Sequence, residues 1–346
     1  MKHNWKYKRL GDICDIYQPK TIASSDLVEN GEYDVFGANG IIGKYSSYNH
    51  EFPELLLTCR GATCGTINVS NPKSWINGNA MVIHSKSKSL LFDYLQYALT
   101  SLDYSNIITG AAQPQITRQT LAPTNIPVPP MEVQQQIAAE LDKINEVIED
   151  CRELLRNLDT LAQSTFYDFF GDPVTNPKDW ITIPFEECID KVKYPAKLQA
   201  KDYANSGRFP IVSQEESLIS GYTDRDDCIY GVSKPIVVFG DHTRCLKFIA
   251  FDFALGADGV KILSPIKSIN SRYFYFTLLL FNIPSLGYSR HYKLLKELAI
   301  PVPPLELQEK FAARIEQIEE QKKTVEKTIA ELQTLLDSRM DYWFND

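Results

Sequence analysis

Two short polar segments have the residue types of binding loops. Residues 59–63 read Cys-Arg-Gly-Ala-Thr and residues 240–244 read Gly-Asp-His-Thr-Arg, and each follows an apolar run typical of a buried strand, at 55–58 and 236–239. Guanidinium, imidazole and hydroxyl groups make directional hydrogen bonds, which suit recognition. Because similar strands lead into different loop tips, the pattern favours two readers of different ligands on one scaffold. Neutral drift of a duplicated domain is the plainer alternative.

The sequence lacks the spacings that assemble a catalytic or metal site. Residues 37–45 resemble a phosphate-binding loop, but the spacing is one residue too long and Tyr45 stands where Ser or Thr would hold magnesium, so a hairpin is the better interpretation. The five histidines and seven cysteines form neither an HExxH nor a CxxC motif. Asp241 and His242 could form an acid–base pair, but in a loop beside Arg244 a solvated polar tip is the better interpretation. We therefore expect no catalytic residue, no metal site and no resident cofactor.

Charge is distributed unevenly along the chain. The formal net charge is −8, yet residues 131–172 and 305–346 carry −7 and −4, whereas residues 1–130 and 173–304 carry +1 and +2. Residues 261–296 hold six basic residues and no acidic one. A polyanion responds first to such a local positive field, so the acidic total does not exclude nucleic acid as a ligand.

The composition is that of a folded protein outside the membrane. Hydrophobic residues make up 44% of the chain, and no apolar run approaches the ~20 residues of a membrane helix. The first residues lack the apolar stretch of a secretory signal. We therefore interpret the cysteines as reduced, mostly buried thiols, and we expect a cytoplasmic protein without membrane contact.

An internal repeat indicates how the two loop-bearing regions are held. Residues 126–172 return as residues 300–346, shifted by 174 positions without a gap, and both copies open with Ile-Pro-Val-Pro-Pro. A repeat of this length indicates a duplicated structural unit. We expect internal pseudo-two-fold symmetry, and a function performed twice at two related places.

Each copy of the repeat has the pattern of a long helix with one apolar stripe. Apolar residues recur at alternating spacings of four and three, the a/d pattern of a coiled coil, and predict a first helix from about residue 131 to 168. A lone helix cannot bury this stripe, so the simplest partner is the other copy, lying antiparallel. Lys322 falls on the stripe, where it can extend its amine to water or fix the register. The predicted packing residues are Ile137, Leu141, Ile144, Ile148, Leu155, Leu158, Phe311, Ile315, Ile318, Val325, Ile329, Leu332 and Leu336.

Several motifs together give the whole chain a family resemblance. The motifs are Trp5 with Leu10-Gly-Asp-Ile, Gly110-Ala-Ala-Gln-Pro-Gln-Ile-Thr, the paired Ile-Pro-Val-Pro-Pro segments, and Phe170-Gly-Asp-Pro followed by Trp180. In these motifs and their order the chain resembles the DNA specificity subunits of type I restriction–modification enzymes. The second copy departs from the pattern, because Gly287-Tyr-Ser-Arg-His-Tyr replaces Gly-Ala-Ala-Gln-Pro-Gln.

The resemblance implies an α+β chain with two pseudo-equivalent mixed α/β target recognition domains, separated by a long antiparallel two-helix coiled coil. The implied boundaries are 1–130 and 171–304 for the recognition domains and 131–170 and 305–346 for the helices. Each domain would read one half of a bipartite double-stranded DNA target, and the helices would set the spacer. Two methyltransferase subunits would dock on the helices and restriction subunits would complete the nuclease. S-adenosylmethionine, Mg2+ and ATP would be bound by those partners, leaving this subunit non-catalytic.

The resemblance also suggests which side chains meet DNA. Arg and Lys pair with guanine edges, Asn and Gln pair with adenine edges, and other polar groups hold phosphates. In the first domain we expect contacts from Asn39, Lys44, Arg60, Thr63, Gln113, Gln115 and Arg118. In the second domain we expect contacts from Gln214, His242, Thr243, Arg244, Tyr288, Arg290, His291 and Lys293.

Two rival functions remain compatible with the residues. One is an enzyme whose site lies between the two unique domains, which turnover by the purified chain would reveal. The other is a bilobal scaffold that binds protein or nucleic acid. Association with a methyltransferase and a split, asymmetric DNA motif would argue against the scaffold.

Overall fold

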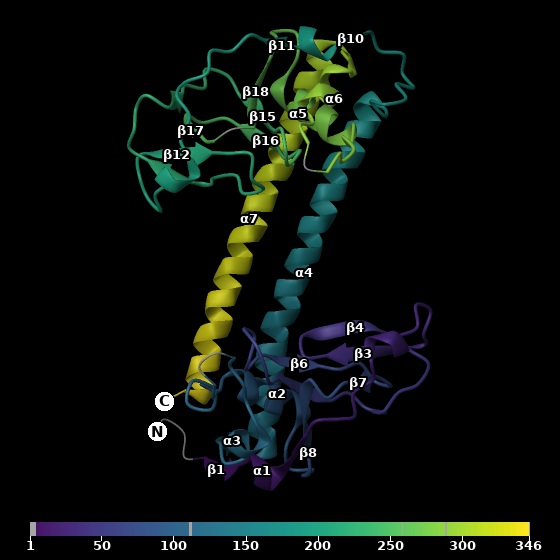
Figure 1. Ribbon diagram of the computed structural model, residues 1–346, viewed down its shortest axis with the longest axis vertical. Coiled ribbons are helices and arrows are strands. Elements are labelled where there is room, and N and C mark those ends of the chain that lie inside the picture. The colour runs from purple at the N-terminus through teal and green to yellow at the C-terminus, as the bar shows by residue number, and fades with distance from the viewer. Residues whose placement is uncertain (1–4, 111–112, 258, 288, 346) are drawn as a thin grey trace. The chain divides into compact units, whose positions relative to one another are not determined.

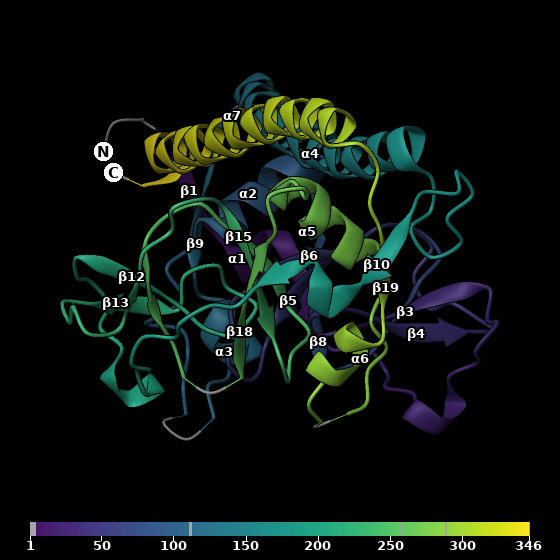
Figure 2. The same ribbon diagram turned by 90° about the horizontal axis from the view of Figure 1, so that it is seen from above.

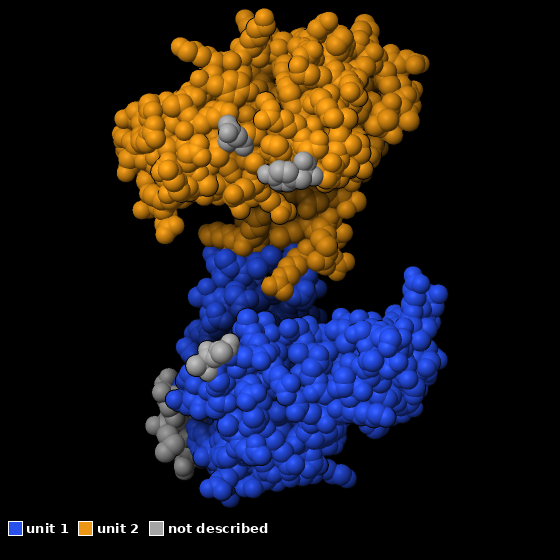
Figure 3. Space-filling view, in the orientation of Figure 1, with its two compact units in different colours: residues 1–151, 328–346 blue, residues 152–327 orange. Residues whose placement is uncertain are grey.

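The computed structural model folds into two compact units (Figures 1 and 3). Unit 1 contains residues 1–151 and 328–346, and unit 2 contains residues 152–327. The residues that the structure describes are 5–110, 113–257, 259–287 and 289–345.

Unit 1 is built from short strands that form three sheets. Its strands are β1 (Lys6–Arg9), β2 (Cys14–Tyr17), β3 (Tyr33–Gly37), β4 (Gly40–Tyr45), β5 (Leu55–Thr58), β6 (Ile67–Val69), β7 (Trp75–Ile76), β8 (Ala80–Ser85) and β9 (Asn125–Val128). Its short helices are α1 (Leu10–Ile13), η1 (Ser24–Asp26), α2 (Phe92–Thr100) and α3 (Arg118–Leu121). The sheet orders are β2-β8-β5-β6, β4-β3-β7 and β1-β9. The hairpin predicted around Asn39 is confirmed as β3–β4, with Gly40 at a φ of 118° in its turn.

Unit 2 repeats this plan with a longer chain. Its strands are β10 (Thr182–Pro184), β11 (Ile189–Asp190), β12 (Phe209–Val212), β13 (Gly221–Thr223), β14 (Ile229–Tyr230), β15 (Ile236–Gly240), β16 (Leu246–Ile249), β17 (Phe253–Leu255), β18 (Val260–Pro265) and β19 (Ala299–Pro301). Its short helices are η2 (Phe185–Glu187), η3 (Ala200–Asp202), α5 (Ser271–Leu280) and α6 (Tyr292–Lys296). The sheet orders are β11-β18-β15-β16, β13-β12-β17-β14 and β10-β19.

The two units share one topology, so the structural repeat includes the sheets as well as the segments whose sequences are similar. The order β2-β8-β5-β6 in unit 1 matches β11-β18-β15-β16 in unit 2. Beside it, the parallel pair β3–β7 matches the parallel pair β12–β17, and β14 is added to the second sheet of unit 2. The predicted pair of pseudo-equivalent mixed domains is therefore confirmed at the level of sheet order and strand direction.

Two long helices, α4 (Met131–Phe170) and α7 (Leu305–Phe344), complete the units. Both have 40 residues, and their bounds differ by the repeat shift of 174 positions. In unit 1 the first part of α4 meets the last part of α7, where Glu140 forms an ion pair with Arg339. In unit 2 the last part of α4 meets the first part of α7, where Asp159 lies 2.5 Å from Lys322. These contacts confirm the predicted antiparallel pairing.

The predicted helix seam also supplies the core of each unit. In unit 1, Ile137 and Leu141 are fully buried in a cluster with Tyr94 of α2. In unit 2, Phe311 of α7 is buried in a cluster with Tyr273 of α5, and Figure 2 shows α5 between the long helices and β15. Ile148, Leu158, Ile315 and Ile318 are also buried, whereas the other seam residues are half-buried: Ile144, Leu155, Val325, Ile329, Leu332 and Leu336. The helices thus gain most of their burial from the domains that they carry.

Candidate nucleic-acid interface

In unit 1, the loop after β5 is joined to the segment before α3. The backbone N–H of Ile116 donates to the carbonyl of Cys59 at 3.0 Å, and the adjacent residues Arg60 and Gln115 form an isolated antiparallel bridge. Two predicted contact residues that are 55 positions apart in the sequence therefore lie side by side, and both are exposed. A guanidinium and an amide held together in this way can donate to adjacent acceptors on a base edge.

The tip of the β3–β4 hairpin joins the same surface. Asn39 accepts hydrogen bonds at its Oδ1 from Thr63 Oγ1 at 2.8 Å and from Thr58 Oγ1 at 3.1 Å. Thr63 belongs to the loop after β5, so the predicted contact residues Asn39, Thr63 and Arg60 come from one continuous surface. Lys44, by contrast, lies on β4 and its Nζ is 3.3 Å from the Asp34 carboxylate.

A cavity of about 390 Å3 opens beside this surface in unit 1. Arg60, Gln115 and Arg118 line it, as predicted contact residues, together with Gln18 and Gln119. Neither of the latter stood out in the sequence, because they lie outside the polar loops and belong to no motif. The Gln18 amide donates to the carbonyl of Gly78 at 2.7 Å, which fixes its side chain at the cavity wall. Gln113, also a predicted contact residue, is exposed in the segment before α3.

Unit 2 builds its loop surface with the same backbone link. The N–H of His291 donates to the carbonyl of Asp241 at 2.8 Å, as Ile116 does to Cys59 in unit 1. His242 therefore takes the place of Arg60, and Arg290 takes the place of Gln115. The two units thus share a backbone arrangement but present different side chains at equivalent positions, which suits two domains that recognise different ligands.

The segment after β12 closes over the same loop of unit 2. The N–H of His242 donates to Gln214 Oε1 at 3.3 Å, and Thr243 Oγ1 donates to the Gln214 carbonyl. A Cβ added at Gly259 would lie 2.4 Å from Gln214 Oε1, and one added at Gly240 would lie 2.8 Å from the Gln214 carbonyl. The close fit of Gln214 against two glycines holds its side chain in one place.

The structure places some predicted contact residues differently. His291 is fully buried: its Nδ1 lies 3.0 Å from the Asp241 carbonyl, and its Nε2 accepts from the N–H of Leu286 at 2.9 Å. His291 thus anchors the loop from inside, and we leave it out of the proposed contacts. Arg244 has a φ of 64° and is exposed, but its Nη1 donates to the carbonyl of Ile283 at 2.9 Å. Tyr288 lies outside the described residues, and Lys293 is exposed on α6.

Part of the basic stretch at 261–296 is engaged within unit 2. The Arg272 side chain is only 13% exposed and its Nη1 lies 2.5 Å from the Glu319 carboxylate. Lys296 Nζ is 2.7 Å from Glu186. Fewer basic side chains of this stretch are therefore available to a polyanion than the sequence suggests. Among the predicted contact residues in the stretch, Arg290 and Lys293 are exposed.

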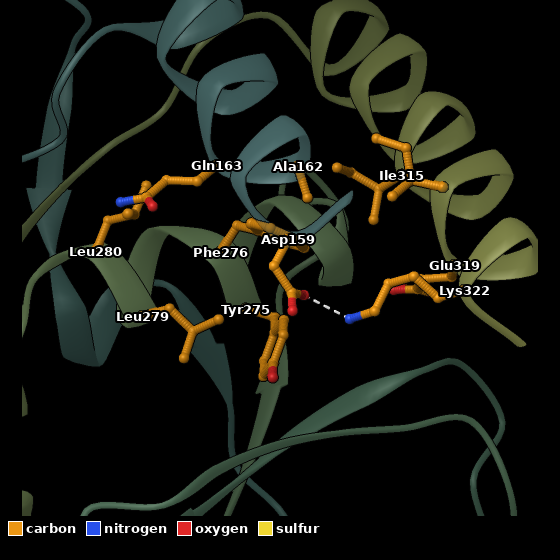
Figure 4. Close-up of a pocket in the computed structure, with 11 residues that line it drawn as sticks. Asp159, Ala162, Gln163, Tyr275, Phe276, Leu279, Leu280, Ile315, Glu319 and Lys322 are labelled. Atoms are coloured by element: carbon orange, nitrogen blue, oxygen red, sulfur yellow. Dashed lines mark hydrogen bonds and ion pairs between the residues drawn. The ribbon is translucent and has the colours of Figure 1, made fainter. Parts of the chain in front are cut away.

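Lys322, predicted on the helix seam, pairs with Asp159 at the rim of a second cavity (Figure 4). This cavity of about 400 Å3 lies among α4, α5 and α7 in unit 2, with Tyr275 and Phe276 in its wall. The pair leaves both charges partly in water, which limits the cost of placing a lysine on an apolar stripe.

Nowhere in the part of the chain that the structure describes do three His, Cys, Asp or Glu side chains gather so that they could hold a metal ion. All seven cysteines are free, and burial raises the pKa of Cys59 and, to about 12, that of Cys14, so these thiols are poor nucleophiles. None of the described helices combines the length and apolar character that crossing a membrane requires.

Comparison with known proteins agrees with this geometry. The sequence profile of the type I restriction modification DNA specificity domain matches residues 2–157 and again residues 177–334. The chain is 27% identical over 164 residues to the Escherichia coli type I restriction enzyme EcoprrI specificity subunit, covering 46% of this chain and 41% of that protein. It is 26% identical over 175 residues to a putative type I specificity subunit of Mycoplasma pneumoniae, covering 49% and 47%. The chain thus spans less than half the length of these two relatives.

Solved structures share the fold over nearly the whole chain. A type I restriction–modification S subunit from M. genitalium superposes with a TM-score of 0.65 at 16% identity, covering 99% of this chain and 96% of that one. A chain from a study of complex assembly in a type I R-M system gives a TM-score of 0.59 at 17% identity, covering 97% and 96%. Because the family profile matches twice, once on each half of the repeat, this chain belongs to the type I restriction modification DNA specificity family.

Proposed function

We propose that this chain is the DNA-reading subunit of a type I restriction–modification complex, with each unit reading one half of a bipartite duplex target. The observation that carries the proposal is the shared link between Ile116 and Cys59 in unit 1 and between His291 and Asp241 in unit 2. It places Arg60 beside Gln115 in one unit and sets His242 and Arg290 in the same places in the other. The same backbone arrangement with different side chains in the two units suits a target whose two halves differ in sequence.

The proposed contacts are exposed or partly exposed side chains on these frames. Arginine donates two hydrogen bonds to guanine, and glutamine and asparagine suit adenine, whereas lysine and threonine serve phosphates as well as bases. In unit 1 the proposed contacts are Asn39, Lys44, Arg60, Thr63, Gln113, Gln115 and Arg118. In unit 2 they are Gln214, His242, Thr243, Arg244, Arg290 and Lys293, with Tyr288 retained from the sequence.

The family to which the chain belongs supports a proposed division of labour among subunits. We propose recognition domains at 1–130 and 171–304, and helical segments at 131–170 and 305–346 that set the unread spacer. Two methyltransferase subunits would dock on those helices and bind S-adenosylmethionine, while restriction subunits would use Mg2+ and ATP. This chain would then contribute recognition and no catalysis, in the cytoplasm where the DNA is.

The test is to sequence the methylated bases of cells that express this chain with its methyltransferase partner. A motif of two short specific blocks separated by a fixed number of unread bases is expected. A continuous motif, or no motif, would sink the proposal. Turnover of a substrate by the purified chain alone would favour an enzyme instead.

A further inference from the structure

A buried lysine in unit 2 has no role in the contacts described so far. Lys247 lies on β16 opposite Val238 of β15, and only 4% of its surface is exposed. Its Nζ donates to the carbonyls of Ser213 at 2.9 Å and Ser217 at 2.5 Å. Burial lowers the pKa of Lys247, because the charged amine is removed from water. An apolar side chain on this strand would avoid that cost, so the amine calls for an explanation beyond packing.

The two carbonyls belong to the segment that carries a reading amide. Ser213 is the first residue after β12, and Gln214 follows it directly. Gln214 is in turn tied to the loop after β15, through His242 and Thr243. Lys247 therefore holds the segment from the strand side, while the reading loop holds it from the other side.

Unit 1 has the same device with a different side chain. Asn68 on β6 lies opposite Leu56 of β5, which is the place of Lys247 opposite Val238. Its Nδ2 donates to the carbonyl of Ala38 at 3.2 Å, and Ala38 is the first residue after β3. The next residue is Asn39, whose amide is tied to the loop after β5 through Thr63.

We propose that Asn68 and Lys247 are positioning residues, one in each unit, that hold the segment bearing the reading amide Asn39 or Gln214 in its DNA-binding position. Asn68 and Lys247, here called the clamp residues, occupy equivalent positions in the shared topology. One donates through an amide and the other through an amine, and each binds a backbone carbonyl close to the side chain that is proposed to contact DNA. A side chain that served only strand packing would have no need to donate to a loop carbonyl. The proposal rests on the function proposed above and adds to it the residues that preorganise each reader.

The first experiment maps methylated bases in cells that express the whole complex with Lys247→Met or Asn68→Leu. Each change removes the hydrogen-bond donor and puts an apolar side chain of similar length in its place. Lys247→Met should relax the half-site of unit 2 by about tenfold in discrimination and leave the other half-site unchanged, and Asn68→Leu should do the reverse. Lys191→Met and Asn106→Leu, at exposed positions of the same units and outside the proposed contacts, are the matched controls and should change neither half-site.

A second experiment measures, without DNA, how firmly each of these residues holds its segment. Backbone hydrogen exchange of the full complex should become faster at 213–217 in Lys247→Met and at 38–40 in Asn68→Leu, with the exchange of the long helices unchanged. Unchanged exchange, or equal relaxation of both half-sites by one variant, would overturn the clamp. A wild-type complex with no split motif would overturn the proposed function instead, and the exchange measurement would still decide whether the clamp exists.

Discussion

Gln134 and Gln308 occupy the same place in the two units, 174 positions apart, and make the same set of hydrogen bonds. Each is fully buried near the start of a long helix. Gln134 Oε1 accepts from the N–H of Leu91 and Gln308 Oε1 accepts from the N–H of Asn270, both at 2.8 Å. Each Nε2 donates to two carbonyls, and these belong to Ser89 and Pro129 in unit 1 and to Ser268 and Pro303 in unit 2.

Replacing either glutamine should destabilise the unit that contains it. Gln134→Ala leaves one N–H and two carbonyls, all in buried or partly buried hydrogen bonds, without their partner, and Gln308→Ala does the same at the second helix. We expect each change to lower the free energy of unfolding by about 2 kcal/mol or more, because unsatisfied buried groups cost about 1–3 kcal/mol each. Urea unfolding measures the loss. The exposed Gln135→Ala and Gln321→Ala are the controls, and a loss no larger than theirs would contradict this role.

The elements that sequence could predict are those with a local or repeated signal. The apolar stripe and the paired prolines placed the long helices within two residues of Met131–Phe170, and the repeat carried that result to Leu305–Phe344. Asn39 and Gly40 marked a hairpin, because Gly accepts the positive φ that the turn requires. The apolar runs before both polar loops are buried strands, as expected.

The residues that sequence could not place depend on contacts between distant segments. His291 sits in a polar loop, yet it is buried, because the Asp241 carbonyl 50 positions away satisfies its ring. Lys247 carries no motif, and only the fold shows that its amine meets the carbonyls after β12. The pairing of Arg60 with Gln115 likewise follows from strand order, which the local pattern does not determine.

Arg60→Ala should relax one half-site only. Arg60 stands on the frame of unit 1, so its loss removes a guanidinium from that reader and leaves unit 2 intact. We expect a loss of about 1–3 kcal/mol in discrimination at one base pair, measured by competition binding of the complex to single-mismatch duplexes. Arg9→Ala, at another exposed arginine of unit 1, is the control. Relaxation of both half-sites, or of neither, would refute the assignment of Arg60.

The isolated chain should bind its target weakly. Its formal net charge is −8, and part of its basic stretch is engaged in internal ion pairs such as Arg272 with Glu319. Few phosphates can then be neutralised by this subunit, so the dependence of affinity on salt should be shallow until basic partner subunits join. Gel-shift titrations of the chain alone and of the complex, at two salt concentrations, compare them. Nanomolar specific binding by the chain alone would show that partners are not needed for affinity.

The Glu140–Arg339 pair should make the junction of α4 and α7 in unit 1 sensitive to acid. Arg339 and then Trp343 donate to the Glu140 carboxylate, and these hydrogen bonds lower the pKa of Glu140 below its ordinary value of 4.5. The folded state therefore binds the proton less readily than the unfolded state does. The contribution of this pair to stability is complete above pH 4.5 and declines as the pH falls through the lowered value.

Glu140→Gln tests this dependence because it keeps the shape of the side chain and removes its charge. Both members of the pair retain 30% of their side-chain surface in water, so we expect a loss of about 1 kcal/mol or less at pH 7. The difference between the wild-type chain and Glu140→Gln should shrink as the pH falls below 4.5 in denaturant titrations, whereas Glu132→Gln, at an exposed position on the same helix, should show no such trend. A difference that stays constant into acid would mean that the contact of the Arg339 guanidinium with the Trp343 ring, and not the carboxylate charge, holds this end of the two helices together.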